Sequence, residues 1–233
     1  MINLALSEEQ EQFQKLSREF ADGEIVPESE AFDRSAAFPE RILEKAWEIG
    51  LVNFQVSEDL GGMGLSTVDS CVILEELAAG CSGISAAIEA SAIAQLPLIL
   101  AGTDDQQEAF LQPLIDSPSV AGYASQDATT YDITAEPSGS DFILNGTHGA
   151  LVNGGHSIWY FVVAEHIETN SSSAFIVPAD AEGLSITGRV ETPGRRARAV
   201  TKLNLDQVKL SSDHLIGSLS RADKVIESIL PSM

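Results

Sequence analysis

The chain has 233 residues, with 35 Asp plus Glu against 13 Lys plus Arg, which gives a formal net charge of -22 and a pI near 4.3. Because phosphate groups and anionic lipids attract clustered Lys and Arg, this balance argues against a nucleic-acid-binding protein and against docking on anionic membranes. A hydrophobic content of 44% and a mean hydropathy of +0.06 indicate a globular chain with a sizeable core, in one or two domains.

The first half of the chain is predicted to be helical. Apolar residues recur there at spacings of three and four, which places them on one face of a helix. Capping boxes mark helix starts at Ser7 and Thr103, each with a Gln three residues later. Another helix is expected to open at Phe38-Pro39, with Pro39 in its first turn, where the missing N–H costs little. The remaining helices are expected over Val68 to Leu77 and over Ser85 to Leu96.

The character of the sequence changes near Pro118, and strand patterns follow. The expected strands are Val120 to Ala124, Phe142 to Asn145, Trp159 to Ala164, Ala174 to Val177, Leu184 to Thr187 and Leu203 to Leu210. Turn-forming residues such as Asn145-Gly146 and Asn153-Gly154-Gly155 separate them. Several short strands without intervening helices predict an antiparallel barrel or sandwich.

After Gly217 the pattern becomes helical again. Ala222, Val225, Ile226, Ile229 and Leu230 form one apolar stripe, and little chain follows to cover it. The predicted fold is therefore α+β: an N-terminal all-helical domain in residues 1–117, a β domain in residues 118–215 and a terminal helix in residues 216–233.

The sequence gives weaker indications of the state of its cysteines and of its cellular location. Cys71 and Cys81 fall in no Cys-x-x-Cys or zinc spacing, so they are expected to be buried free thiols. The N-terminus lacks the basic and long apolar regions of a signal peptide. The most apolar stretch, residues 86–100, is interrupted by Glu89, Gln95 and Pro97 and is expected to be a buried helix. The expected location is a reducing cytoplasm.

Segments along nearly the whole chain resemble the acyl-CoA dehydrogenase family, and they occur in the family's order. They include FPERILEKAWEIGLVNFQVSEDLGGMGLS, VILEELAAG and FILNGTHGALVNGGHSIWYFVVAE. The matching segments are Phe38 to Ser66, Val72 to Gly80, Ala101 to Ser117, Phe142 to Glu165 and Leu203 to Gly217. The resemblance implies the family's N-terminal helical domain and middle β domain, an FAD cofactor, an acyl thioester substrate and an oligomeric assembly.

The first flavin segment of the family departs from its pattern in this sequence. Family members are similar in a Thr-Glu-Pro-Gly-x-Gly-Ser-Asp run, whose Thr and backbone contact the flavin and whose Ser helps to hold acyl-CoA. The matching run here is Ser125 to Asp132, where Ser125 keeps a hydroxyl and Asp132 is retained. Tyr131 replaces the small serine, and the glycines that allow a close backbone approach are missing.

The second flavin segment departs as well. Where the family has Trp-Ile-Thr, this chain has Ala150-Leu151-Val152, so the aromatic wall and the hydroxyl donor are both absent. By the resemblance, flavin contacts are expected at Tyr123, Ala124, Ser125, Ala150, Leu151 and Val152. Acyl-CoA contacts are expected at Tyr131 and Asp132. The loss of one hydrogen bond to a buried flavin edge costs about 0.5–1.5 kcal/mol.

No residue of the chain matches the family's catalytic base. That base is a glutamate of a C-terminal four-helix domain, and the present sequence ends in what resembles the first helix of that domain. The chemistry requires a carboxylate over the substrate's α-carbon while a flavin accepts the β-hydride. Glu75 and Glu76 are expected to form a solvated helix face instead.

Other candidate sites have simpler explanations. His148, His156 and His166 fit no metal spacing and are expected at solvent-facing strand or turn positions. The Gly61-Gly62-x-Gly64 cluster follows no strand, which favours a structural turn over a phosphate loop. Ser125 and Ser157 lack the Gly-x-Ser-x-Gly setting of a hydrolase nucleophile.

The distribution of positive charge is uneven. After Lys45 no Lys or Arg occurs until Arg189, while that span holds 19 Asp plus Glu. One basic cluster follows, formed by Arg189, Arg195, Arg196, Arg198 and Lys202. It either receives an anionic cofactor or an acidic partner, or forms a solvated loop.

Two functional hypotheses remain open, from different classes. The first is an acyl-CoA dehydrogenase-like subunit that contributes half of a flavin-dependent oxidoreductase site and needs a partner chain for the base. Its partner is expected to be a second copy or a full-length acyl-CoA dehydrogenase-like subunit. The alternative is a non-catalytic scaffold or regulatory relative that has lost flavin and acyl-CoA binding. A related flavin monooxygenase or flavin-free hydratase chemistry is not distinguished by the sequence.

Overall fold

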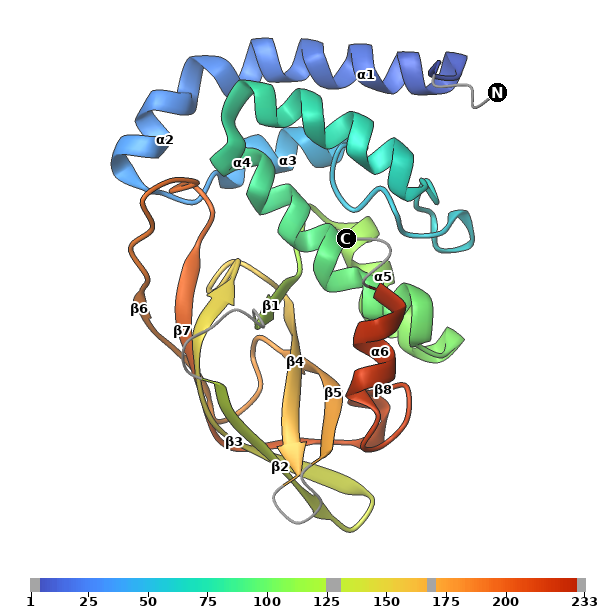
Figure 1. Cartoon of the computed structure of the whole chain (residues 1–233), viewed down its shortest axis with the longest axis vertical. Coiled ribbons are helices and arrows are strands. Elements are labelled where there is room, and N and C mark those ends of the chain that lie inside the picture. Colours follow the sequence, from blue (N-terminus) through green and yellow to red (C-terminus); the bar gives the residue numbers. More distant parts are fainter. Residues whose placement is uncertain (1–4, 125–130, 167–170, 230–233) are drawn as a thin grey trace.

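The computed structural model describes residues 5–124, 131–166 and 171–229. A layer of helices lies over one end of a curved β-sheet (Figure 1). The helices are α1 (Glu8–Phe20), α2 (Ser29–Ser35), α3 (Glu40–Glu48), α4 (Thr67–Ala101), α5 (Asp104–Asp116) and α6 (Ala222–Ile229). The strands are β1 (Gly122–Ala124), β2 (Tyr131–Ser138), β3 (Asp141–Val152), β4 (Trp159–His166), β5 (Ser171–Pro178), β6 (Leu184–Arg189), β7 (Val200–Leu210) and β8 (Leu215–Ile216).

The helix starts follow the predicted caps. Ser7 and Thr103 both form complete capping boxes with Gln10 and Gln106. Pro39 occupies the N-cap of α3 rather than its first turn, because the helix begins at Glu40. A third capping box, Ser66 with Asp69, opens α4 and was not predicted.

Helix α4 contains both of the helices predicted over Val68 to Leu77 and Ser85 to Leu96. It runs from Thr67 to Ala101 as two helical segments that meet at a kink at Cys81, whose φ of -161° and ψ of 112° are not helical. An 18-residue window of α4 is apolar enough to span a membrane, but 72% of that window is buried within the fold. Burial of this kind is typical of a central core helix, as expected for residues 86–100.

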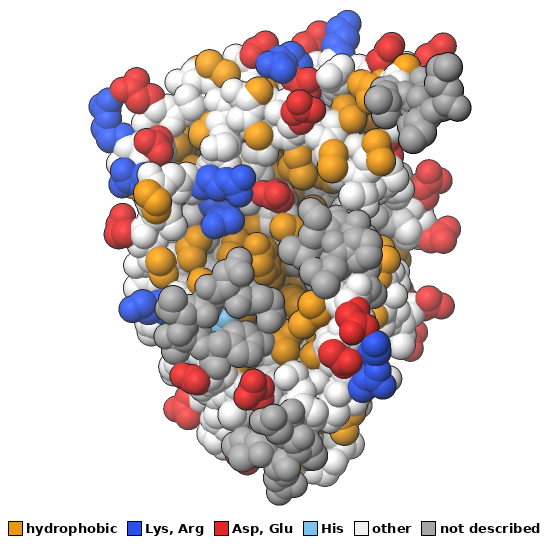
Figure 2. Space-filling view, viewed as in Figure 1, with side chains coloured by type: hydrophobic (Ala, Val, Ile, Leu, Met, Phe, Trp, Pro, Cys, Tyr) orange, Lys and Arg blue, Asp and Glu red, His pale blue; other side chains and the backbone are white. Residues whose placement is uncertain are grey.

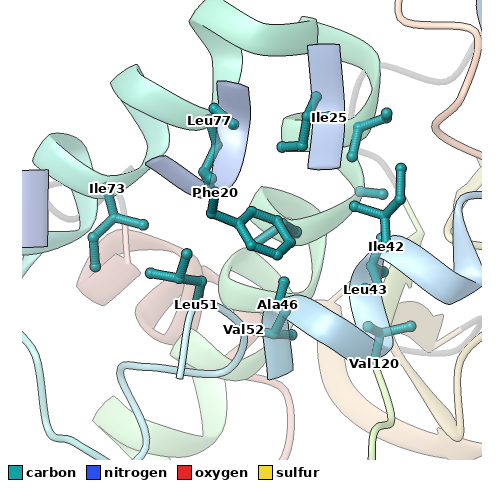
Figure 3. Close-up of a cluster of buried hydrophobic side chains, with 14 of the residues drawn as sticks. Phe20, Ile25, Ile42, Leu43, Ala46, Leu51, Val52, Ile73, Leu77 and Val120 are labelled. Carbon is teal, nitrogen blue, oxygen red and sulfur yellow. The ribbon is translucent and has the colours of Figure 1, made fainter. Parts of the chain in front are cut away.

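A hydrophobic cluster joins α1, α3 and α4. Phe20 and Ile25 point toward Ile42 and Ala46 of α3 and toward Leu77 of α4 (Figure 3). All five side chains are buried. Burying apolar side chains from three helices at one place fixes their mutual orientation, since each side chain contributes about 1.5–3 kcal/mol when it leaves water.

The β region is a single eight-stranded sheet in the order β6-β7-β3-β1-β4-β5-β8, with β2 paired to β3 and β4. Most pairs are antiparallel, and β1 and β2 each run parallel to β4. The α+β class with a largely antiparallel β domain is confirmed. Strands β2 and β8 were not predicted from the sequence.

The terminal helix is better covered than its sequence predicts. Ala222 and Val225 are 1% and 3% exposed, and they join a buried cluster with Ala94 and Leu98 of α4 and Ile176 of β5. The expectation that the α6 stripe has nothing to cover it is therefore wrong for these two residues. Leu230 lies outside the described residues.

Candidate functional site

Strand β1 brings the two predicted flavin segments together. It pairs with the end of β3 in a register that places Tyr123 opposite Val152 and Ala124 opposite Leu151. Residues separated by almost thirty positions are thus neighbours on adjacent strands. Ser125 lies outside the described residues, and whether any of these residues contacts a flavin stays a prediction.

Few side chains at this junction are accessible to a ligand, because most of them are buried. Ala124, Leu151 and Val152 are 2%, 0% and 2% exposed, so their side chains are enclosed by the protein. Tyr123 and Ala150 are half-buried and have the accessible side chains of the set. Among these residues the junction therefore presents one phenol and one methyl group.

A buried hydroxyl lies next to this junction on the neighbouring strand. Thr201 of β7 stands opposite Leu151, and within the described residues its Oγ1 is buried without a hydrogen-bond partner. A Cβ at Gly154 would lie 1.9 Å from that oxygen, so only glycine fits there. Sequence reasoning missed Thr201, because it stands outside the segments that resemble flavin contacts.

A buried polar network fastens β1 to the helical region. The Nδ2 of Asn53 donates to the carbonyls of Leu114 (3.0 Å) and Ser119 (2.9 Å), and its Oδ1 accepts from Ser91 (2.8 Å) and Gln95 (2.7 Å). Ser91 in turn accepts from the backbone N–H of Ala121 at 2.9 Å, just before β1. Removal of any of these groups would leave a buried partner unsatisfied, which makes the network a rigid support.

Asn153 forms a second attachment, at the turn after β3. Its Nδ2 donates to the carbonyls of Ala87 in α4 (2.9 Å) and Ala121 (3.2 Å). The sequence predicted Asn153 only as a turn residue. The structure shows that the ends of β1 and β3 are held against the second half of α4.

Residues Tyr131 and Asp132 lie on β2, beside the same strand. They pair with His148 and Thr147 of β3, and the Asp132 side chain is exposed. Their predicted contact with acyl-CoA remains untested, and the side chain of Tyr131 lies outside the described part of the structure.

Two of the three histidines are buried, contrary to the prediction. His148 is 1% exposed, and its Nδ1 accepts from the backbone N–H of Ala150 at 3.1 Å. His166 is 6% exposed, with its Nε2 2.8 Å from the Oγ of Ser173. Both occupy inward strand positions that the sequence spacing did not reveal. His156 is exposed as expected, stacked on Phe38 with ring centroids 4.0 Å apart.

Glu75 and Glu76 differ in their exposure to solvent. Glu75 is exposed, as expected. Glu76 is 5% exposed, paired with Arg18 of α1 and hydrogen-bonded to Gln14 at 3.0 Å. The prediction of a solvated face is therefore wrong for Glu76, because α1 packs across that side of α4.

The two cysteines are also less buried than predicted. Cys71 is exposed and Cys81 is half-buried at the kink of α4. Among the described residues no group of three His, Cys, Asp or Glu is arranged to hold a metal ion.

The remaining candidates have structural roles. Gly61 and Gly64 adopt positive φ, and a Cβ at Gly62 would lie 2.1 Å from the carbonyl oxygen of Val56, so this cluster is a tight turn. Ser157 is buried and donates to the carbonyl of Asn153. Burial raises the pKa of the Tyr160 phenol, which keeps it protonated as it accepts from Gly155.

A groove follows the kink of α4. It has a volume of about 400 Å³ and lies between the two halves of the helix, with Leu74 and Ala78 on one side and Ala86, Ile93 and Leu96 on the other. Figure 2 shows hydrophobic side chains on this face of the molecule and a hollow at its centre. The volume lies at the small end of the roughly 300–1,000 Å³ typical of ligand pockets.

The groove adjoins the strand junction through α4. The second half of the helix turns Ala87 and Ser91 toward β1 and the β3 turn, while Ala86 and Ile93 line the groove. Tyr123 packs against the cluster that contains Ala94 and Leu98. The groove and the strand junction therefore lie on different faces of the second half of α4, which begins at the kink.

Residues 7–117 match the family described as acyl-CoA dehydrogenase, N-terminal domain. The chain is 32% identical to a probable acyl-CoA dehydrogenase of Mycobacterium leprae, over 91% of this chain and 57% of that protein. It is 28% identical to a probable medium-chain specific acyl-CoA dehydrogenase of Caenorhabditis briggsae, over 97% of this chain and 59% of that protein. The chain thus carries an N-terminal domain of the acyl-CoA dehydrogenase family, and it resembles members of that family along more than 90% of its length.

The solved structures agree on the fold. Butyryl-CoA dehydrogenase from Megasphaera elsdenii superposes with a TM-score of 0.90 at 20% identity, covering 98% of this chain and 63% of that one. At this identity the similarity shows the fold alone. The chain spans less than two thirds of the length of these relatives.

The described residues fit a flavin only in part. The β1–β3 junction is held rigidly by Asn53 and Asn153, and both strands are already paired on their two sides. It supplies no side-chain donor at Ala150, Leu151 or Val152, and the hydroxyl of Thr201 is enclosed. Tyr123 and Ala150 would be the residues that hold FAD from this side.

Proposed function

We propose that this chain is a subunit of an acyl-CoA dehydrogenase-like flavoenzyme that acts on acyl thioesters. The observation that carries the proposal is the groove of α4, a helix whose other face holds the β1–β3 junction. A thioester's acyl chain would lie against the apolar side chains of this groove. The family relationship gives this arrangement its chemical interpretation.

The chain's own contribution is to bind and orient. Leu74, Ile93 and Leu96 would hold the acyl chain and exclude water from it. Tyr123 and Ala150 would form one wall for FAD, which supplies a hydride acceptor when bound. Tyr131 and Asp132, on β2, remain the proposed contacts to the rest of the thioester.

The proposal requires a base from outside the described residues. Of the two carboxylates that line the groove, Glu89 is paired with Arg195 and Glu75 is exposed to water. Neither matches the family's base. We propose that a second copy or a full-length acyl-CoA dehydrogenase-like subunit completes the site, in the cytoplasm.

A second candidate function is a non-catalytic scaffold or regulatory relative that has lost flavin and acyl-CoA binding. The burial of Leu151 and Val152 favours it, because neither side chain can donate a hydrogen bond to a flavin. The span without Lys or Arg between Lys45 and Arg189 favours it too, since this region offers no cation to a phosphate-rich cofactor.

Titration of the full chain with FAD and with octanoyl-CoA separates the two functions. The flavoenzyme proposal expects octanoyl-CoA binding and a bound flavin spectrum, either alone or after co-expression with the proposed subunit. Ile93→Asp should abolish octanoyl-CoA binding, because it places a charge in the groove. Ala79→Asp, at an exposed position of α4 outside the groove, is the control and should bind normally. No binding of either ligand under both conditions would refute the flavoenzyme and favour the non-catalytic function. Octanoyl-CoA binding without FAD would contradict both functions.

A further inference from the structure

A polar cavity lies between α2 and the loop that joins β6 to β7, residues 190–199. It has a volume of about 330 Å³ and is open to solvent. Charged side chains of both signs line it, Glu30 and Asp33 from α2 and Arg195 and Arg196 from the loop. The residues of α4 that line it are small, namely Ala78, Gly80, Cys81, Ser82 and Gly83. An open cavity with this lining suits a small charged molecule and does not suit an alkyl chain.

One carboxylate and one guanidinium in this cavity have no partner of opposite charge. Glu30 pairs within its own helix, and Arg195 pairs with Glu89 of α4. The side chains of Asp33 and Arg196, in contrast, form no ion pair or hydrogen bond among the residues that the structure describes, and the Nε of Arg196 is buried. Because a partly buried guanidinium is poorly hydrated, an anionic group that reaches Arg196 is attracted more strongly than at a fully exposed arginine.

The two charged walls of the cavity are held together by a side chain at the end of β6. Arg189 donates to the carbonyl of Ala36, which caps the C-terminal end of α2, and to the carbonyl of Arg196 in the loop. The loop also rests directly on α4, since a Cβ at Gly83 would lie 3.2 Å from the carbonyl carbon of Arg195. Opposite charges whose backbones are already fixed can bind a ligand with little further loss of conformational freedom.

We infer that this cavity binds a small zwitterion, an aliphatic amino acid, whose carboxylate pairs with Arg196 and whose ammonium group pairs with Asp33. A guanidinium offers a carboxylate two parallel N–H donors, and an ammonium group donates to a carboxylate. Ser29, which also lines the cavity, donates its hydroxyl proton to the carbonyl of Val26 at 2.9 Å and keeps its lone pairs for the ammonium group. The site lies outside the groove of the proposed function and does not depend on it.

The test is a titration of the full chain, followed by amide NMR spectra, with four probes. Alanine and β-alanine are isomeric zwitterions with different separations between their charges. Propionate lacks their ammonium group, and ethylamine lacks their carboxylate. The better of the two isomers should bind about tenfold more tightly than propionate or ethylamine, because it forms both charged contacts at once. The inference is overturned if neither isomer binds more tightly than both single-charge probes, since the cavity would then be an ordinary ion site or no site.

Two substitutions assign the charged groups. Asp33→Asn, at an exposed position, should reduce the affinity of the better isomer to that of propionate and leave propionate binding unchanged. Arg196→Gln should reduce it to that of ethylamine, and the amide spectra establish that each variant is folded. Asp22→Asn, which removes an equally exposed carboxylate outside the cavity, is the matched control and should bind like wild type. Equal losses in Asp33→Asn and Asp22→Asn, or no loss in Asp33→Asn, would overturn the assignment.

Discussion

The helical region and the β region use positive charge in different ways. All five Lys and Arg residues of residues 1–117 pair with carboxylates, and one of these pairs, Arg18 with Glu76, joins two helices. Residues 118–215 hold six Lys and Arg, and of these only Arg195 forms an ion pair within the described structure. Arg189 instead donates to the carbonyls of Ala36 and Arg196.

The difference shows which forces hold each region. In the helical region, charged contacts tie together elements that also share a core. The β region depends on its interior, where Phe142, Tyr160 and Phe175 pack between the strands. Stability should therefore respond to different substitutions in the two halves.

The largest effect is expected in the β interior. Phe175 is fully buried and contacts Phe142 edge-on, with ring centroids 5.1 Å apart. Phe175→Ala should lower the free energy of unfolding by about 3–5 kcal/mol, because it leaves a cavity. Phe13→Ala, at a half-buried position of α1, should cost less. Urea denaturation followed by circular dichroism measures both, and equal losses would contradict the comparison.

A smaller loss is expected at the buried ion pair. Glu76→Ala removes a buried carboxylate that forms an ion pair with Arg18 and accepts a hydrogen bond from Gln14, and hydrogen bonds to charged groups contribute about 1.5–3 kcal/mol. Glu75→Ala, the adjacent exposed residue, should change stability very little. A similar loss in the two variants, measured by the same denaturation, would show that Glu76 does not clamp α1 to α4.

The next effect concerns a helix start. Thr103→Ala breaks the capping box of α5 and should cost about 1 kcal/mol. Thr187→Ala, at an exposed position of β6, removes the same hydroxyl without a cap and should cost less. Thermal unfolding of both variants tests whether the loss of stability comes from the lost cap or from the loss of any threonine hydroxyl.

The smallest effect depends on pH. Hydrogen bonds from the Ser66 and Gln10 side chains lower the pKa of Asp69 below its ordinary value of 3.8. A lowered folded-state pKa stabilises the protein above the unfolded pKa, and this contribution is lost as pH falls through the folded value. Asp69→Asn should therefore make stability less sensitive to pH below about 3.8, as measured by denaturation across an acid series. An unchanged pH profile would contradict this role.

Local signals in the sequence predicted local structure well. The Ser7 and Thr103 capping boxes formed because each depends on four consecutive residues. The kink at Cys81 falls between the two helices predicted over Val68 to Leu77 and Ser85 to Leu96, whereas its exact position was not predicted. Strand β2 was missed because Glu136 and Pro137 weaken its strand pattern, while pairing with β3 stabilises it.

The candidate site was predictable in its parts but not in its contacts. The resemblance gave Tyr123 and Leu151 as members of one site, and the sheet register places their strands side by side. Asn53, Asn153 and Thr201 could not be found in this way. Their importance depends on burial and on partners from other elements, which a single sequence does not contain.

The loop that holds Arg195 also determines how the chain can be cut. Trypsin cleaves after Lys and Arg, and the long interval between Lys45 and Arg189 gives it no site even in an unfolded chain. The exposed Arg195 is therefore one of the first places where a folded molecule can be nicked. The rate of tryptic cleavage after Arg195 therefore measures how tightly this loop packs against α4.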